Sequence, residues 1–232
     1  MHRSSRSVED FAQGLAESLL DALAHGTAAR FDPGRGIVYV SGAMGDPARR
    51  RATYEDVLAQ PDHVVAEVIH GTLYTFARPR TRHARSSSRL GAVLDGPFDR
   101  GTNGGPGGWI ILDEPELHLG PDPDILVPDL AGWRRTRMPE MPDAPYLTLA
   151  PDWVCEVVSP STEDVDRAEK VPLYAREQVA HVWIVDPLVR TLEVLRLDGG
   201  TYRLVTTVRA DARVHAEPFD ALELELALLW QS

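Results

Sequence analysis

Residues 153–162, Trp-Val-Cys-Glu-Val-Val-Ser-Pro-Ser-Thr, decide how the rest of the sequence is interpreted. The first six residues form a nearly continuous apolar run, which is typical of a strand at the centre of a sheet. Successive side chains of a strand point to opposite faces, so Glu156 shares a face with Val154 and Val158. A carboxylate within a buried strand costs free energy unless a cation compensates its charge. The residues alone leave two interpretations of Glu156 open: a buried ion pair with an arginine, or a metal ligand.

The sequence after this strand predicts a helix and more strands. Residues 163–177 have a helical composition, although Pro172 must begin, kink or break a helix. Residues 181–185 form a second buried strand, and the runs 191–197 and 201–208 flank an Asp-Gly-Gly turn that predicts a hairpin. A helix between two apolar strands is typical of the α/β or mixed α+β class. We expect a central mixed sheet flanked by helices, with a C-terminal β-hairpin.

The sequence before this strand predicts smaller elements. The capping pattern Thr53-Tyr54-Glu55-Asp56 indicates a short helix. The β-rich runs 64–69 and 72–76 predict a hairpin. Helical spacing returns over 82–95, and short strands are expected at 109–112, 117–119 and 125–127.

The first 50 residues are interpreted as an extension of the domain at 51–232. They contain one amphipathic helix at 8–24 and a short strand at 37–40. The length of 232 residues suits one domain of about 150–200 residues plus such an extension.

Composition narrows the class of protein. The chain has 35 acidic and 24 basic residues and a net charge of −11, which argues against unspecific coating of nucleic acid. Its single cysteine, Cys155, excludes an intramolecular disulfide and a multi-cysteine zinc site. Its apolar runs are too short for a bilayer and no signal peptide is evident, so we expect a cytoplasmic protein without membrane contact. Lys170 is the only lysine among the 24 basic residues.

Two groups of arginines stand out against the acidic background. One group falls in a window without acidic residues, and the other follows the run 125–127. Each is either a solvated surface or a binding site for a phosphate backbone, and the sequence leaves both readings open. The groups are Arg78, Arg80, Arg82, Arg85 and Arg89, and Arg134, Arg135 and Arg137.

An ordered series of motifs resembles the Uma-two restriction endonuclease family, within the PD-(D/E)XK nuclease superfamily. The series is Glu-Val-Val-Ser-Pro-Ser-Thr at 156–162, Asp166 and Lys170 four residues apart, Tyr-Ala-Arg at 174–176 and His-Val-Trp-Ile-Val-Asp-Pro at 181–187. The resemblance extends upstream to residue 51 and covers about 51–230. Its upstream matches are the capping pattern at 53–56, Val-Ala-Glu-Val-Ile-His-Gly at 65–71, Arg-His at 82–83 and Pro-Asp-Leu-Ala at 128–131.

The resemblance implies a restriction-endonuclease-like core with a divalent-metal phosphodiesterase site. Asp129 and Glu156 would be the metal ligands, because Mg²⁺ or Mn²⁺ prefers hard oxygen donors. Lys170 would orient or deprotonate the attacking water, and Glu67 would support the metal or that water. Arg82-His83 would contact the substrate. We therefore expect Glu67, Asp129, Glu156 and Lys170 to be catalytic.

Two departures from the superfamily pattern affect this site. The superfamily places a lysine two residues after the glutamate, where this chain has Val158, so Lys170 must reach back from the following helix. Asp124 is a rival to Asp129 because it also follows a proline. Further candidate ligands are Glu114 and Glu116.

The function expected from the sequence is a Mg²⁺-dependent endonuclease that hydrolyses phosphodiester bonds of DNA. One alternative is a nuclease-fold protein that binds nucleic acid or a protein partner without cleaving it. Another is a metal-dependent hydrolase of a different phosphodiester, such as RNA. The partner in the first case is nucleic acid, with DNA favoured, and the sequence leaves homodimerisation open.

Overall fold

The computed structural model describes residues 27–32, 37–42, 50–102 and 104–231. The chain forms two compact units, Met1–Ala77 and Arg78–Ser232. The helix predicted at 8–24 lies outside the described residues, and the domain boundary after residue 50 stays a prediction. In the described part of the chain, no helix has the length and apolarity needed to cross a membrane.

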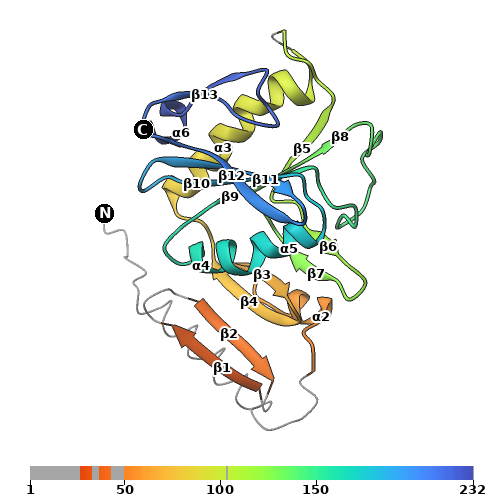
Figure 1. Ribbon diagram of the computed structural model, residues 1–232. Coiled ribbons are helices and arrows are strands. Elements are labelled where there is room, and N and C mark those ends of the chain that lie inside the picture. The colour runs from red at the N-terminus through yellow and green to blue at the C-terminus, as the bar shows by residue number, and fades with distance from the viewer. Residues whose placement is uncertain (1–26, 33–36, 43–49, 103, 232) are drawn as a thin grey trace, which may run out of the picture. The chain divides into compact units, whose positions relative to one another are not determined.

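The described residues of the first unit form an antiparallel sheet and a short helix (Figure 1). The capping box predicted at the start of the helix is present, because the Thr53 backbone N–H donates to Asp56 Oδ2 at 2.8 Å. The predicted hairpin and the predicted short strand at 37–40 are also confirmed. In sheet order the strands are β1 (Thr27–Asp32), β2 (Ile37–Gly42), β4 (Thr72–Ala77) and β3 (Val64–Ile69), and the helix is α2 (Tyr54–Leu58).

The turn between β3 and β4 explains why this hairpin could be predicted. His70 and Gly71 both have positive φ angles, of 52° and 75°. Two consecutive positive φ angles match the turn to the twist of the strands, and glycine adopts them without steric cost. The His-Gly pair therefore sets the register, in which Ile69 pairs with Thr72.

The second unit is built on a mixed sheet. Its central strand β9 is parallel to β10 and antiparallel to β8, while the other neighbouring strands are antiparallel. The predicted mixed α+β class and the C-terminal hairpin are thus confirmed. In sheet order the strands are β12 (Thr201–Arg209), β11 (Thr191–Asp198), β10 (His181–Asp186), β9 (Trp153–Val157), β8 (Leu130–Arg134) and β5 (Trp109–Asp113).

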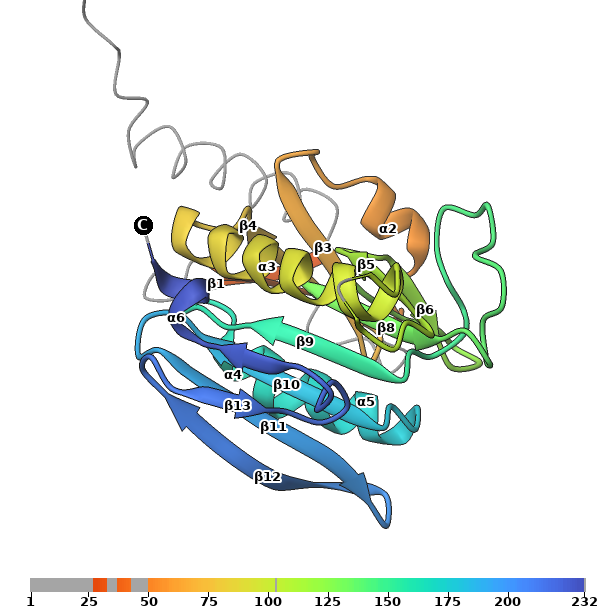
Figure 2. The same ribbon diagram turned by 90° about the horizontal axis from the view of Figure 1, so that it is seen from above.

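Helical segments lie on both sides of this sheet (Figure 1, Figure 2). On one side α3 (Thr81–Leu94) continues into the π-helical turn η1 (Asp95–Asp99). On the other side the predicted helix at 163–177 consists of α4 (Glu163–Val165), the π-helical turn η2 (Asp166–Lys170) and α5 (Val171–Arg176), with Pro172 in the first turn of α5. The remaining elements are β6 (Leu117–Leu119), β7 (Asp124–Leu126), β13 (Arg213–His215), β14 (Glu223–Glu225) and α6 (Ala227–Trp230).

The predicted alternation along β9 divides the two faces of the sheet. Trp153, Cys155 and Val157 belong to the buried apolar core that also includes Leu90 and Leu94 of α3. An aromatic cluster anchors that core. The Phe219 ring lies 4.7 Å from Phe98, 4.8 Å from Trp109, 4.9 Å from Trp153 and 5.6 Å from Trp183, measured between ring centroids.

Strand β8 was not expected from the sequence. Its sequence, Leu-Ala-Gly-Trp-Arg, has a glycine at its centre, and glycine is unfavourable inside a strand. The fold nevertheless requires it: a Cβ at Gly132 would lie 3.2 Å from the Trp153 ring and 3.3 Å from the Trp109 ring. Gly132 thus makes room for the two indoles that flank β8.

The aromatic cluster gives the first prediction. Phe219→Ala removes the ring that contacts four other aromatic rings, and should lower the free energy of unfolding by about 3–5 kcal/mol. Leu204→Ala is the control, because Leu204 is 53% exposed and its loss should change stability by less than about 0.5 kcal/mol. Urea unfolding followed by tryptophan fluorescence measures both, and equal losses would contradict the central place of Phe219.

Candidate active site

Glu156 lies in the middle of β9 on the face opposite the aromatic core, and only 2% of it is exposed. Its Oε1 accepts a hydrogen bond of 2.6 Å from the Tyr174 hydroxyl. The same oxygen lies 3.5 Å from Lys170 Nζ. Both partners come from the helical segments between β9 and β10, so the β9–helix–β10 crossover itself compensates the buried charge.

Lys170 is held between two carboxylates. Its Nζ also lies 3.2 Å from Asp166 Oδ1, and its side chain is 5% exposed. Asp166, Lys170 and Tyr174 recur every four residues, which brings their side chains to one side of a helical segment. The turn that contains the first two is π-helical, and such turns often occur at functional sites.

The environment of Asp166 disfavours its ionised form. Burial raises the pKa of Asp166, and the Lys170 charge and the hydrogen bond from Thr162 only partly offset this rise. Two carboxylates that converge on one ammonium share a single compensating charge. The group therefore carries a negative excess when both acids are ionised, which favours a further cation.

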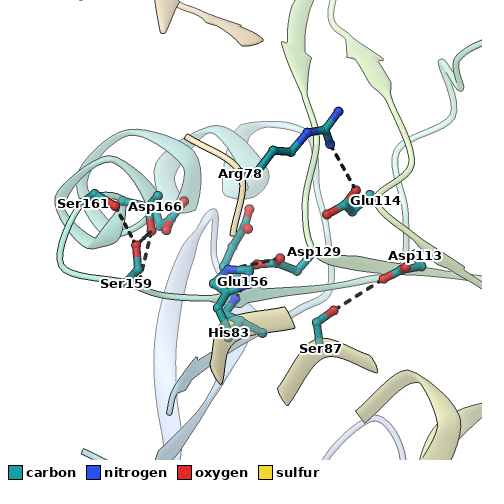
Figure 3. A network of polar contacts seen from close by, with 12 residues as sticks. Arg78, His83, Ser87, Asp113, Glu114, Asp129, Glu156, Ser159, Ser161 and Asp166 are labelled. Atoms are coloured by element: carbon teal, nitrogen blue, oxygen red, sulfur yellow. Dashed lines mark hydrogen bonds and ion pairs between the residues drawn. The ribbon is translucent and has the colours of Figure 1, made fainter. Parts of the chain in front are cut away.

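Asp129 lies at the start of β8, beside the peptide that joins Glu156 to Val157. Its Oδ2 accepts a hydrogen bond of 2.7 Å from the Val157 backbone N–H. Its Oδ1 lies 3.3 Å from His83 Nε2 of α3 (Figure 3). These two contacts, from a strand and from a helix, fix the orientation of the carboxylate.

His83 is buried and its protonation depends on the surrounding acids. Burial disfavours the charged imidazolium, but the hydrogen bond to Asp129 and the charges of Asp129, Asp166 and Glu114 outweigh this effect. The pKa of His83 is therefore raised. His83 acts here as a partner of Asp129, while the neighbouring Arg82 is exposed.

The donors at this site fit a hard divalent cation. Across the described residues, no three His, Cys, Asp or Glu side chains are grouped so that they could hold a metal ion. Mg²⁺ does not need such a cage, because it commonly binds one or two carboxylates and keeps waters or substrate oxygens as its other ligands. Asp129 and Glu156 would supply such a pair, and their hydrogen bonds are of the kind that orients metal ligands.

The other predicted residues have further partners of their own, although Glu114 lies close to Asp129, to whose carbonyl its backbone N–H donates at 3.1 Å. Asp124 is on β7 and forms an ion pair of 2.7 Å with Arg176, which favours Asp129 over Asp124 as a ligand. Glu114 Oε2 lies 3.9 Å from Arg78 Nη1, and Glu116 Oε1 lies 2.8 Å from His118 Nε2. Glu67 is on β3 of the first unit, so its catalytic role stays a prediction.

Sequence reasoning assigned no role to Asp166 and Tyr174, although both are bonded within the site. Their four-residue spacing to Lys170 was the available signal. It was weak because Pro172 falls inside the same stretch and made a continuous helical face uncertain. Contact between His83 and Asp129 had no local signal at all, since it depends on how α3 packs on the sheet.

Comparison with known proteins identifies the class. The chain shares its fold with a solved structure described as "a putative nuclease belonging to DUF820 from Anabaena variabilis ATCC 29413", with a TM-score of 0.62 and 21% sequence identity. The match covers 77% of this chain and 97% of the other. A comparison with curated protein sequences gave no match. The chain therefore shares the fold of this solved structure, and its mixed sheet flanked by helices is the mixed α+β class expected from the sequence.

The family follows from the sequence itself. The model of the Uma2 family, described as "Putative restriction endonuclease", matches residues 51–228. The chain belongs to the Uma2 family, and the predicted family membership is confirmed. The description of the family indicates a nuclease, whose substrate is nucleic acid.

The bond between Tyr174 and Glu156 gives the second prediction. Tyr174→Phe removes a buried hydrogen bond to a charged group and should lower the free energy of unfolding by about 1.5–3 kcal/mol. The matched control is Tyr202→Phe, whose hydroxyl donates to the neutral Val179 carbonyl at 2.6 Å and should cost about 0.5–1.5 kcal/mol. Urea unfolding of both variants is the measurement, and a smaller loss for Tyr174→Phe would contradict the buried charge-assisted bond.

Proposed function

We propose that the protein is a Mg²⁺-dependent endonuclease that hydrolyses phosphodiester bonds of DNA. The observations that support this proposal are the ion pair of Lys170 with Glu156 and the position of Asp129 beside the Glu156–Val157 peptide. Asp129 is bonded to the peptide that follows Glu156, and Lys170 Nζ lies 3.5 Å from Glu156 Oε1. The family description as a restriction endonuclease supports DNA as the substrate.

Asp129 and Glu156 would hold Mg²⁺, or Mn²⁺ in its place. When bound, such an ion offsets charge on the scissile phosphate and lowers the pKa of a bound water. His83 and the Val157 N–H keep the Asp129 carboxylate in place, while Tyr174 does the same for Glu156. These contacts orient the ligands before substrate arrives.

Lys170 would bind a phosphate oxygen and orient the attacking water. Its ammonium is compact and can lose its proton when buried, whereas a guanidinium stays charged and needs a planar set of acceptors. Asp166 Oδ1 lies 3.2 Å from Nζ and is a second acceptor besides Glu156, which limits the positions that the ammonium can take. The lysine is thus positioned by two acids and is not a freely moving surface cation.

The third prediction tests these roles by supercoiled-plasmid nicking with Mg²⁺ or Mn²⁺. Asp129→Asn, Glu156→Gln and Lys170→Arg should each reduce the cleavage rate about 100-fold or more, since each removes a group proposed to act at the phosphate. Circular dichroism verifies that each variant is folded.

The matched control for the lysine is Arg176→Lys. It also exchanges one cation for another, but at the part-buried ion pair with Asp124, outside the proposed site, so cleavage should stay near the wild-type rate. Full activity in Lys170→Arg would remove Lys170 from the site. Cleavage of RNA in place of DNA would support the alternative phosphodiesterase, and binding without any cleavage would support the non-catalytic alternative.

The fourth prediction concerns the metal. Chelation with EDTA should abolish nicking, and Mg²⁺ or Mn²⁺ should restore it, because the proposed chemistry requires the ion. Titration calorimetry with Mn²⁺ provides a readout independent of cleavage. Wild-type protein should bind the ion and Glu156→Gln should bind it at least about tenfold more weakly. Nicking that persists in EDTA would contradict metal dependence.

A further inference from the structure

The two groups of arginines noted in the sequence differ in their surroundings. In the group that follows β8, Arg135 forms an ion pair of 2.7 Å with Asp99, and Arg137 forms one of 3.0 Å with Asp152. The Arg134 guanidinium stacks 4.5 Å from the Trp109 ring centroid. Each of these arginines therefore already has an intramolecular partner.

The arginines of α3 are different. Arg82, Arg85 and Arg89 are exposed, and the helix contains no aspartate or glutamate. Within the described ranges, no acidic side chain forms an ion pair with Arg82 or Arg89. Arg85 donates from Nε to the Gln231 backbone carbonyl at 2.6 Å, and no acidic side chain among the described residues forms an ion pair with it.

These three side chains form one stripe along the helix. At 3.6 residues per turn, positions 82, 85 and 89 lie within about 60° of one another around the axis. The rise per residue spreads them over about 10 Å. The stripe faces away from the buried side of α3, which carries His83, Leu90 and Leu94.

The charge of this stripe is unfavourable in the isolated protein. The first turn of a helix normally holds acidic residues, because the helix dipole is positive there. In α3 that turn has no acid and holds Arg82. An anion bound along the stripe would offset this repulsion. The protein as a whole is acidic, with a net charge of −11, yet among the described residues these cations have no acidic partner.

The chemistry of the stripe favours a duplex backbone over a single strand. Binding of single strands relies on aromatic side chains that stack on bases, and α3 contains no phenylalanine, tyrosine or tryptophan. Arginines on a helix suit contacts to phosphates, which position a protein on a duplex without reading its sequence. The exposed Ser88 lies beside Arg85 and Arg89 and adds a neutral donor.

We propose that the α3 stripe of Arg82, Arg85 and Arg89 binds the sugar–phosphate backbone of duplex DNA and aligns it with the active site. The stripe and the active site share this helix: Arg82 is exposed, while the next residue, His83, is buried and its ring contacts the Asp129 carboxylate. This inference rests on the proposed function for its substrate. It adds the surface that holds the duplex and assigns α3 a role on both of its sides.

The fifth prediction measures binding separately from cleavage. Fluorescence anisotropy with a short labelled DNA duplex is recorded in EDTA over a range of salt concentrations. Arg82→Gln/Arg89→Gln should weaken binding about tenfold or more at low salt. It should also make the slope of log affinity against log salt shallower by about 1.8, since two phosphate contacts are lost.

The matched control is Arg203→Gln/Arg209→Gln on β12. Both residues are exposed, and the control changes the net charge by the same amount. Its affinity and salt slope should stay near those of the wild type. Equal effects of the two double variants, or no effect of the α3 variant, would overturn the proposed surface.

The remaining outcomes separate this inference from the nuclease proposal. Stripe-dependent duplex binding in a protein that cleaves no DNA would uphold the surface and reject the endonuclease. Cleavage with unchanged binding in the α3 variant would do the reverse. Absence of duplex binding, or tighter binding of duplex RNA or of a single strand, would overturn the assignment of the stripe to duplex DNA.

Discussion

The buried Glu156 carboxylate is the constraint on which the second unit depends. Strand β9 pairs with β8 and β10, so a charge at its centre cannot be solvated at an edge. Isolated buried charges are too costly to persist, and the compensation here comes from Lys170 and Tyr174. The segment between β9 and β10 must therefore lie against the face that carries Glu156. A buried ion pair gains little net stability over apolar packing, so stability alone does not explain its presence.

The alternation of β9 lets one strand serve both core and site. Trp153, Cys155 and Val157 join the aromatic core, and burial raises the pKa of the Cys155 thiol well above its ordinary value. Val157 belongs to both sides: its side chain is in the core, while its backbone N–H holds Asp129. The packed core thus fixes the position of Glu156, which lies on β9, and fixes Asp129 through the Val157 N–H of the same strand.

Local patterns explain which features could be predicted. The alternation of β9, the capping box at Thr53 and the turn at His70-Gly71 are encoded by neighbouring residues, and the structure has all three. Strand β8 was not predicted because a glycine inside a strand is locally unfavourable. Gly132 is needed there because the rings of Trp109 and Trp153, which are distant in sequence, leave no room for a side chain. The contact between His83 and Asp129 joins residues on α3 and β8, so no spacing in the sequence could indicate it. The family resemblance supplied both Glu156 and Lys170, and the structure adds that Glu156 and Asp166 hold the lysine between them.

Burial also explains which basic residue occurs at which position. All basic residues of the chain except Lys170 are arginines. At the surface the guanidinium group pairs with acids or stays solvated. At position 170 the cation is 5% exposed and must fit within 3.2 Å and 3.5 Å of two carboxylate oxygens. A guanidinium has five donors in a fixed plane, and burial would leave some of them without acceptors, whereas an ammonium has three donors that can rotate. Burial therefore accounts for the lysine at position 170. The arginines of α3 are exposed, so the same restriction does not apply to them. A flat, permanently charged guanidinium at the surface suits contact with a phosphate of a bound molecule.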